Sequence, residues 1–508
     1  MPGYPMTSPD LIPLADAESI RRLDRLTCER QHISSLALME RAASRCTERL
    51  LAHYPNNRHW TIVAGAGNNG GDGLAIARQL QLRGHHITAY HPQHCPTSPD
   101  HAANAARLAR LIPTHDLAAY TPPTRGIQID ALYGVGLNRP LAAADADLIH
   151  AMNRAPVPTV AIDLPSGLCA DDDSPAPIIR AARTLCLGCP KAALLWQENE
   201  EYVGTLELVP IDLDCDALAD TPAAARWLTA AWLRGQYRPR RRFAHKGDAG
   251  RLLIVAASRG MTGAAIMAAQ AALRGGCGLL TAHLPTVCCS AYHAAVPESM
   301  TDADVHPDHN THLDHDIPAD ALLVGCGLGT HPDSAALIAD LNTRYHDRSI
   351  LWDADALNLI ARDSALQQLP PRSILTPHPG EFARLYGKAL THDRERIPAA
   401  QALAARMGAV IVLKGKYSII SAPDNTTVIN PTGNAGMAKG GSGDVLAGLI
   451  AALLAQGYAP FPAACLGTYL HGLAADLTLE TSAINSLTAS DIIAAIPAAW
   501  CSVATTPA

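Results

Sequence analysis

The sequence predicts two consecutive α/β domains, each built on a mostly parallel sheet with helices on both faces. Three observations support this fold class. The chain has 508 residues, which is too long for one ordinary hydrophobic core. In both halves, short β-rich runs alternate with helical stretches, as in βαβ units. Between about residues 212 and 250 the alternation stops, and Pro239 in the basic run 238–246 cannot continue a helix or a central strand. We therefore expect domains at residues 1–225 and 226–508.

The composition is that of a soluble globular protein whose partners are small molecules. Hydrophobic residues make up 48% and charged residues 17%, and the net charge of −7 argues against a nucleic-acid surface. There is neither an export signal nor an apolar run of membrane length, so we expect no membrane contact. The thirteen scattered cysteines predict reduced thiols in the cytoplasm, and Cys186 and Cys189 are interpreted as structural. The oligomeric state stays open, with a homo-oligomer among the alternatives.

Each half carries five expected strands. In the first half they follow a helical pattern over residues 15–52 and lie at 60–64, 86–90, 127–133, 159–163 and 184–187. In the second half they lie at 252–256, 321–324, 349–353, 373–376 and 410–414, with a helix from Gly260 to Arg274. Ligands of such folds bind at the carboxyl ends of parallel strands, so site residues are expected in the loops that follow them.

The loop after the first strand is rich in glycine. Residues 65–73 formally contain the G-x-G-x-x-G pattern of dinucleotide-binding folds. That pattern also needs an acidic residue at the end of the next strand, which here ends in Tyr90-His91-Pro92. The sequence therefore does not support redox use of an intact nicotinamide cofactor, while phosphate binding by the glycine-rich backbone remains expected.

Three oxygen-bearing side chains fall at neighbouring strand ends in the first half. Asn69, Asp130 and Ser166 could together hold one weakly bound monovalent cation, because hard cations prefer oxygen ligands. Alternatively, Asn69 and Ser166 only cap turns and Asp130 only caps a helix. Spacing alone supports the two interpretations about equally.

The second half is organised around the glycine-rich segment 434–446. Residues Gly440 to Gly443 precede an apolar stretch that reads as a buried helix, so their N–H groups can converge on an anion at its positive end. Asp444 falls in the first turn, where it could take a proton from an attacking hydroxyl. The alternative is a flexible glycine linker. A linker needs no helix behind it and no acid at its start, so phosphoryl-transfer chemistry is favoured.

Further polar or glycine-rich loops follow the other strands of the second half and are expected to line one crevice with this segment. These loops are 325–329, 353–358, 377–381 and 414–418.

The first half resembles the NAD(P)H-hydrate epimerase domain, a Rossmann-like fold that carries potassium. The resemblance is carried by Leu38-Met39-Glu40 and by residues 67–73, 130–141 and 163–167. It implies K⁺ at Asn69, Asp130 and Ser166, and Asp163 as the catalytic residue that handles the proton at C6. Lys191 is either the partner of Asp163 or a surface lysine. The implied substrate contacts are Asn68, Asn69, Gly70, Gly71, Asp72, Gly134, Val135, Gly136, Leu137, Asn138, Arg139, Pro140 and Asp163.

The second half resembles the ADP-dependent NAD(P)H-hydrate dehydratase family, within the ribokinase-like fold. Five motifs match in order: 245–246, 263–265, 353–355, 378–381 and 436–446. Cys326 departs from the pattern, since proline is expected there, but removes no proposed ligand. The resemblance implies catalysis by Asp444, with ADP bound by Lys414, Gly415, Lys416, Tyr417, Ser418 and Gly443. The implied hydrate contacts are Ala264, Gly327, His378 and Asp444.

The chemistry of dehydration follows from leaving-group strength. Hydroxide leaves poorly, because water has a pKa of about 15.7, so phosphorylating the C6 hydroxyl and then expelling phosphate lowers the barrier. The Gly440 to Gly443 amides would stabilise the transferring phosphoryl group. Mg²⁺ is expected to bridge the phosphates, with Glu381 or Asp355 reaching it through water.

The sequence thus predicts a bifunctional repair enzyme acting on NADHX and NADPHX. Its first domain would interconvert the R and S epimers, and its second would convert the S epimer and ADP to NAD(P)H, AMP and phosphate. One alternative is an alcohol kinase of the ribokinase fold with an accessory first domain. Another is a non-catalytic first domain that senses nucleotides or acts as a scaffold.

Overall fold

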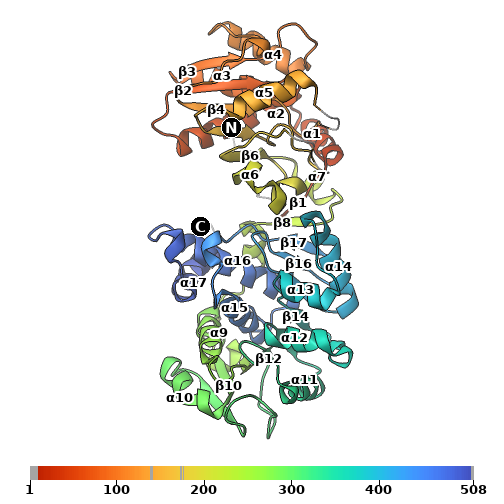
Figure 1. Cartoon of the computed structure of the whole chain (residues 1–508), viewed down its shortest axis with the longest axis vertical. Coiled ribbons are helices and arrows are strands. Elements are labelled where there is room, and N and C mark those ends of the chain that lie inside the picture. The colour runs from red at the N-terminus through yellow and green to blue at the C-terminus, as the bar shows by residue number, and fades with distance from the viewer. Residues whose placement is uncertain (1–9, 138–140, 172–173, 175–176, 505–508) are drawn as a thin grey trace. The chain divides into compact units, whose positions relative to one another are not determined.

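The computed structural model describes residues 10–137, 141–171, 174 and 177–504 (Figure 1). The chain divides into two compact units. One contains the residues up to Ala223 together with His392–Arg394, and the other contains Ala224–Thr391 and Glu395–Ala508. The division at Ala223 lies close to the boundary expected at residue 225.

Two helices, rather than one, occupy the first helical pattern of the sequence. Helix α1 (Ala17–Gln31) follows the short strand β1 (Leu11–Pro13), and α2 (Ser35–His53) comes next. His32 ends α1 in the left-handed conformation with φ 52°. Ser34 then begins α2, because its side chain accepts a hydrogen bond from the Ala37 amide.

The first unit contains a fully parallel six-stranded sheet in the order β3-β2-β4-β5-β6-β7. Ile62 of β2 packs in the core on one face of the sheet and Val63 in the core on the other, as the alternation of strand side chains requires. Two cores on opposite faces confirm the three-layer, Rossmann-like architecture. The strands are β2 (His59–Ala64), β3 (His86–Tyr90), β4 (Ile127–Ala131), β5 (Thr159–Ile162), β6 (Arg183–Leu187) and β7 (Thr205–Val209). Only β7 was not expected, since this edge strand is half exposed.

The connection from β2 to its helix is very tight. A Cβ atom at Gly70 would lie 1.8 Å from the Gly65 carbonyl oxygen, so only glycine fits where the helix starts against the loop. The strand order reverses between β2 and β4, which makes the carboxyl ends of these two strands the topological switch point of the sheet. The remaining helices are α3 (Asn68–Leu82), α4 (Pro99–Ala109), α5 (Ala143–Asn153), α6 (Glu200–Val203) and α7 (Cys215–Ala219).

The second unit has a mixed sheet in the order β8-β17-β16-β15-β14-β13-β12-β9-β10-β11. The five strands expected from the sequence form its parallel centre, from β15 to β9, and the order reverses between β12 and β9. The antiparallel pairs β15–β16 and β16–β17 were not expected, because their strands are only three residues long. The strands are β8 (Arg226–Leu228), β9 (Arg251–Val255), β10 (Leu279–Pro285), β11 (Met300–Asp304), β12 (Ala321–Val324), β13 (Ser349–Trp352), β14 (Ser373–Leu375), β15 (Val410–Leu413), β16 (Ile419–Ser421) and β17 (Thr427–Ile429).

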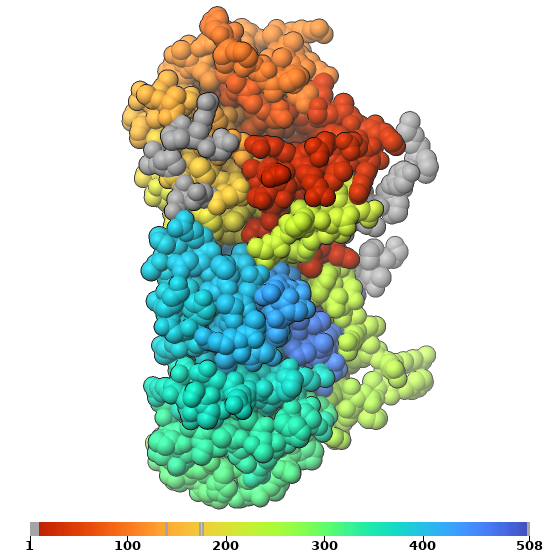
Figure 2. Space-filling model, turned by 90° about the vertical axis from the view of Figure 1, so that its right-hand side faces the viewer, coloured from red at the N-terminus to blue at the C-terminus, as the bar shows by residue number. Residues whose placement is uncertain are grey.

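Helices cover both faces of this sheet, as the predicted ribokinase-like domain requires. Helices α11 to α14 lie on one side and form the blue-green surface of Figure 2, and α9, α15 and α17 lie on the other (Figure 1). No helix of the described residues is long and apolar enough to cross a membrane. The helices are α8 (Ala230–Gln236), α9 (Thr262–Gly275), α10 (Thr286–Ala295), α11 (Pro332–Arg344), α12 (Asp355–Arg362), α13 (Pro379–Tyr386), α14 (Arg396–Met407), α15 (Ser442–Ala455), α16 (Pro460–Thr478) and α17 (Ala489–Ala504).

Helix α15 is buried along its length and packs closely against α9. At their crossing, a Cβ atom on Gly448 would lie 2.0 Å from the backbone oxygen of Ala268. Backbone cannot move aside as a flexible side chain would, so this glycine allows α15 and α9 to lie as close together as they do. The position of the glycine-rich segment at the start of α15 depends on that contact.

Gly448→Ala should therefore lower the free energy of unfolding of the second unit by about 1–3 kcal/mol, the usual cost of overpacking a core. Gly235→Ala is the matched control, since Gly235 is helical and has nothing within 4 Å of an added Cβ. Urea denaturation measures both variants. Equal stability of the two variants would show that the helices can move apart at no cost.

Candidate active sites

The first site lies at the switch point of the first unit, where the loops after β2, β4 and β5 converge. A Cβ on Gly134 would lie 3.2 Å from Asp163 Oδ2 and 3.3 Å from the Asn69 side chain. The residues from Asn68 to Asp72 form the first turn and a half of α3. The structure thus brings together Asn69, Gly134 and Asp163, three of the expected substrate contacts. Of the others, Asn138, Arg139 and Pro140 lie outside the described residues.

Asp130 and Ser166 form a tight hydrogen-bonded pair. Asp130 Oδ1 accepts a bond of 2.6 Å from Ser166 Oγ, and Asp130 Oδ2 accepts one of 2.7 Å from the Ser166 amide. Burial raises the pKa of Asp130 to about 6, although the hydrogen bonds from Ser166 act to lower it. Asp130 lies within β4, so the alternative that it only caps a helix is wrong.

The side-chain amide of Asn69 is bonded through its nitrogen only. Its Nδ2 donates to the Tyr133 carbonyl at 2.9 Å, while its buried Oδ1 has no hydrogen-bond partner in the structure. A buried amide oxygen without a partner is unfavourable. Hard cations bind oxygen ligands, so a cation bound to Asn69 Oδ1 would give this oxygen the partner that it otherwise lacks.

Asp163 and Lys191 form a buried ion pair. Lys191 Nζ donates to Asp163 Oδ1 and, at 3.0 Å, to the Leu187 carbonyl, and its side chain is 1% exposed. Burial alone lowers the pKa of Lys191, but the Asp163 carboxylate reverses this and the net pKa is raised. The alternative of a surface lysine is therefore wrong. Asp163 itself has a φ of 67°, a strained conformation for a residue other than glycine.

Two further carboxyl groups interact electrostatically with this pair. Burial raises the pKa of Asp24 to about 6, with a further contribution from Asp163. Burial also raises the pKa of Asp72 well above its usual range, again with a contribution from Asp163. Sequence reasoning missed Asp24, because a single acid on the amphipathic helix α1 looks like a solvated side chain.

The second site lies at the switch point of the second unit, between β9 and β12. Gly327 has a φ of 62°, and a Cβ there would lie 3.1 Å from the Ala264 Cβ. The two expected hydrate contacts from the loop after β12 and the start of α9 therefore touch. Ser258 Oγ donates to the Gly327 carbonyl at 2.9 Å and fixes the loop.

Asp444 lies near Cys326, Asp353 and Lys414, which follow three different strands. One oxygen each of Asp444 and Asp353 and the sulfur of Cys326 lie within 4.8 Å of one another. Lys414 Nζ is 3.0 Å from Asp353 Oδ1, which also accepts a bond of 2.8 Å from Thr376. Burial, with a contribution from Asp353, raises the pKa of Asp444 to about 6. Asp444 can therefore exchange a proton near neutral pH.

The start of α15 faces the same point. The helix begins at Ser442, so Ser442 and Gly443 are part of its first turn rather than of a preceding loop. Its N-cap, Gly441, has a φ of 92° and offers no side chain to the first N–H groups, which stay available to an anion. A Cβ on Gly443 would lie 3.4 Å from Lys414 Nζ, so the lysine and the helix N-terminus could hold one phosphate together.

His378 and Glu381 cap each other at the start of α13. His378 Nδ1 accepts the Gly380 amide at 3.0 Å, and Glu381 Oε2 accepts the His378 amide at 2.8 Å. Burial raises the pKa of the Glu381 carboxyl to about 7, although Lys414 lies 3.8 Å away. The His378 ring is half exposed, and its Nε2 lies 3.4 Å from Glu381 Oε1.

The expected nucleotide-binding segment, Lys414 to Ser418, follows β15. Lys416 donates to the Gly433 carbonyl, and the Tyr417 ring lies 5.7 Å from the Trp227 ring. Ser418 Oγ and Gly415 are hydrogen-bonded to each other. Trp227, from β8, was not predicted, because nothing in a three-residue strand distant in sequence signals it.

The two sheets and the carboxylates at their switch points define a two-domain α/β enzyme. A family model described as NAD(P)H-hydrate dehydratase matches residues 252–498, and one described as YjeF-related protein N-terminus matches residues 35–193. A ribokinase-like superfamily protein from Enterococcus faecalis is similar with a TM-score of 0.50 and 26% identity, covering 56% of this chain and 98% of that one.

Two relatives match nearly the whole chain. The bifunctional NAD(P)H-hydrate repair enzyme Nnr of Moorella thermoacetica is 36% identical, covering 95% of this chain and 96% of that protein. The enzyme of the same name from Escherichia coli is 35% identical, covering 94% and 92%. The chain belongs to the family of bifunctional NAD(P)H-hydrate repair enzymes. This confirms the resemblance and the prediction of an enzyme.

Lys191→Met should leave the Asp163 charge buried without its partner. We expect the free energy of unfolding of the first unit to fall by about 3–5 kcal/mol, as when one member of a buried ion pair is removed. Asp163→Asn combined with Lys191→Met should recover most of the loss. Arg110→Met, at an exposed cation of the same unit, is the control. Chemical denaturation measures all four proteins, and a Lys191→Met effect below about 0.5 kcal/mol, the range of surface changes, would contradict the assignment.

Proposed function

We propose that this chain repairs hydrated nicotinamide cofactors in two reactions. Residues 1–225 interconvert the R and S epimers of NADHX and NADPHX. Residues 226–508 use ADP to convert the S epimer to NAD(P)H, releasing AMP and phosphate. The observation that carries the proposal is that the relatives named for this repair match both domains, and each domain has an ionisable site at its switch point. The thirteen cysteines, interpreted as reduced thiols, support a reducing compartment, the cytoplasm.

A small-molecule alcohol kinase is the less favoured alternative. Such a kinase would account for the second domain and for the phosphate site at α15. It would not account for a first domain that matches repair enzymes along with the rest of the chain. A first domain that only senses nucleotides would likewise have no need of the strained Asp163 and its buried lysine.

In the epimerisation, Asp163 handles the proton. Its Oδ1 is occupied by Lys191 and by the Leu187 amide at 3.2 Å, whereas its Oδ2 faces the loop at Gly134. Oδ2 is therefore the oxygen that exchanges a proton with the hydrate. Lys191 keeps the carboxylate in place and stabilises its charge. The backbone from Asn68 to Asp72 and the loop from Gly134 to Leu137 hold the hydrate. Asn138, Arg139 and Pro140, which lie outside the described residues, are proposed as further contacts.

Potassium fits the group formed by Asn69, Asp130 and Ser166. The partnerless Asn69 Oδ1 supplies a neutral oxygen and Asp130 a negative one, and Ser166 Oγ can contribute its second lone pair. When bound, the ion supplies positive charge next to the hydrate. Its binding also satisfies a buried oxygen that otherwise has no partner.

Potassium should therefore stabilise the first domain in the absence of substrate. At a concentration one hundred times its dissociation constant, linkage predicts about 2.7 kcal/mol. The rise in Tm with KCl should disappear in Asn69→Ala, with LiCl at equal ionic strength as the control for general salt effects. If KCl and LiCl raise the Tm of the unaltered protein equally, Asn69, Asp130 and Ser166 have a structural role and do not bind potassium.

In the dehydration, Asp444 acts as the base. It takes the proton of the C6 hydroxyl as that oxygen attacks the β-phosphorus of ADP, and AMP leaves. Lys414 and the first amides of α15, at Gly443 and its neighbours, stabilise the transferring phosphoryl group. Phosphate then leaves C6 and the neighbouring carbon C5 loses a proton, to the departing phosphate or to water, so that the double bond of the nicotinamide forms between C5 and C6. Residues Lys414 to Ser418 hold the nucleotide, and Ala264, Gly327 and His378 contact the hydrate.

Magnesium fits beside Glu381 or Asp355, reached through water. Burial has raised the pKa of Glu381 to about 7, and a nearby divalent cation would favour its ionised form. One Asp355 oxygen accepts the Gly329 amide at 2.9 Å and keeps further acceptor capacity. The ion, when bound, neutralises charge on the phosphates of the nucleotide.

Asp444→Asn should abolish dehydration while leaving epimerisation intact. Loss of a general base costs on the order of 10²–10⁴ in rate, and the amide preserves the shape of the helix start. Starting from the R epimer with ADP, the variant should equilibrate the epimers and release almost no NADH, followed at the absorbance band of reduced nicotinamide. Near-normal NADH release would remove Asp444 from catalysis, and loss of both activities would contradict the independence of the two domains.

The dehydration rate should also fall as the pH drops below about 6. Asp444, whose pKa is raised to about 6, must be ionised to accept a proton, so its protonation at lower pH removes the base. Glu381→Gln is the control, because the pKa of Glu381 is raised to about 7 and its protonation could produce a similar acid limb. A pH profile of kcat/KM that keeps its limb near 6 in this variant supports Asp444. Disappearance of the limb would assign it to Glu381.

A further inference from the structure

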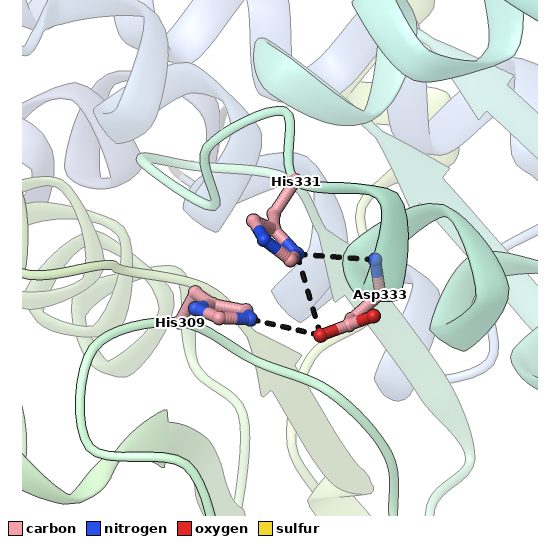
Figure 3. A group of neighbouring side chains, drawn as sticks. All are labelled: His309, His331 and Asp333. Atoms are coloured by element: carbon pink, nitrogen blue, oxygen red, sulfur yellow. Dashed lines mark hydrogen bonds and ion pairs between the residues drawn. The ribbon is translucent and has the colours of Figure 1, made fainter.

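A group of histidines in the second unit has no part in the two sites described above. His309 belongs to the loop between β11 and β12, and His331 and Asp333 belong to the start of α11. Figure 3 shows both rings directing a nitrogen toward the Asp333 carboxylate. Asp333 Oδ2 lies 3.1 Å from His309 Nε2 and 3.3 Å from His331 Nδ1, and all three ligand atoms lie within 4.8 Å of one another.

These spacings match the edges of a metal coordination tetrahedron. With metal–ligand bonds of about 2.0–2.1 Å, the ligand atoms of tetrahedral zinc lie roughly 3.3–3.4 Å apart. The two distances to Asp333 differ from that value by only a few tenths of an ångström. Three ligand atoms from two segments of the chain are thus placed so that one ion could contact all of them.

The bonding of His331 favours a cation between these groups. His331 Nδ1 accepts a hydrogen bond from the Asp333 amide at 3.2 Å, so this nitrogen carries a lone pair rather than a proton. The same lone pair faces the Asp333 carboxylate at 3.3 Å, which is also an acceptor. Two acceptors in contact are repulsive unless a positive charge lies between them. The amide bond is long, so exchanging it for a metal bond costs little.

The loop that carries His309 is held rigidly. Asp304, at the end of β11, accepts bonds from the amides of His306 at 2.7 Å and Thr311 at 2.6 Å. The buried Asn310 donates to the carbonyls of Ala256 and Ala257 at 2.9 and 3.0 Å. These bonds fix the backbone on both sides of His309, so the loop is preorganised for a ligand.

A direct bond also ties the two ligand-bearing segments together. Ser334, next to Asp333, donates through its hydroxyl to the Asn310 carbonyl at 2.9 Å. The His306 ring lies tilted against the His309 ring with centroids 3.8 Å apart. Only His309, His331 and Asp333 have ligand atoms within 4.8 Å of one another, so His306 supports the ring of His309 and is not counted as a ligand.

The site is open to ions. The side chains of His331 and Asp333 are 49% and 53% exposed, whereas that of His309 is 16% exposed. An ion can therefore enter from solvent and keep water as its fourth ligand, as in zinc sites with three protein ligands. Two imidazoles and one carboxylate suit Zn²⁺ and its neighbours in the first transition series, in contrast to the oxygen ligands that Mg²⁺ requires.

We propose that His309, His331 and Asp333, none of which is an expected nucleotide or hydrate contact, form a binding site for one divalent transition-metal ion of the zinc class. The ion joins the β11–β12 loop to the start of α11. No part of the proposed repair chemistry depends on it.

The test is a titration of the chelator-treated, full-length protein with Co²⁺, followed by visible absorption. Tetrahedral cobalt gives intense bands and replaces zinc in such sites. The unaltered protein and His315→Ala should bind one equivalent with the same affinity, because His315 is an exposed histidine of the same segment outside the group. His309→Ala and Asp333→Asn should weaken that equivalent by at least about 10–100-fold, the loss seen even for outer partners of metal ligands.

Several results would overturn the proposal. Equal titrations of all four proteins would place any bound cobalt elsewhere, for example on cysteines, and equal losses in His315→Ala would indicate a diffuse histidine surface. Asp333 is half exposed, so Asp333→Asn keeps the test valid if His309→Ala fails to fold. As a second readout, Zn²⁺ should raise the Tm of the second-unit transition in the unaltered protein and not in Asp333→Asn.

Discussion

Both domains depend on the same electrostatic constraint, which is a carboxylate buried at the end of a parallel strand and balanced by one lysine. Asp163 follows β5 and is paired with Lys191, and Asp353 follows β13 and is paired with Lys414. A buried charge without a partner destabilises a fold by several kcal/mol. Each lysine therefore makes it possible to keep an ionised acid at the edge of the sheet where ligands bind.

The pairing also separates the roles of neighbouring acids. In the second domain, Lys414 lies directly against Asp353, while Asp444 is left with a pKa raised to about 6. One carboxylate thus stays engaged in holding the lysine, and the other is free to exchange a proton. Cys326 fits into this arrangement as a neutral group, because burial and the Asp444 carboxylate raise the pKa of its thiol. The thiol lies 4.0 Å from Asp353 and removes no proposed ligand.

The two sites share a second feature, which is a glycine-rich turn that lets backbone approach closely. In the first domain, a Cβ at Gly70 would meet the Gly65 carbonyl oxygen and a Cβ at Gly65 would meet the Leu132 carbonyl oxygen, and the helix starts almost at the end of the strand. In the second, Gly441 takes a left-handed conformation at the start of α15, and Gly448 allows that helix to lie close to α9. The N–H groups at these helix starts are therefore placed by close contacts between backbone segments.

The sequence by itself determined the fold class, the two-domain organisation and the family. These features depend on local patterns, namely the alternation of strand and helix, the glycine-rich turns and the order of the motifs. All three can be recognised along the chain without a structure. The edge strands β7, β8 and β11 escaped prediction, because short or half-exposed strands lack a continuous apolar run. Local pattern also merged the two helices α1 and α2 into one, since a single left-handed residue, His32, ends a helix without changing the periodicity.

Only the tertiary structure decided which side chains meet. Lys191 could be a surface residue or a buried partner until its side chain was seen against Asp163, and Asp24 and Trp227 gave no signal at all. The same holds for His309 and His331, which are separated in sequence by a strand and a glycine-rich loop and meet only because β11 and α11 place them together. Which side chains meet depends on the packing of segments that are distant in sequence. The spacing of residues along the chain does not determine that packing.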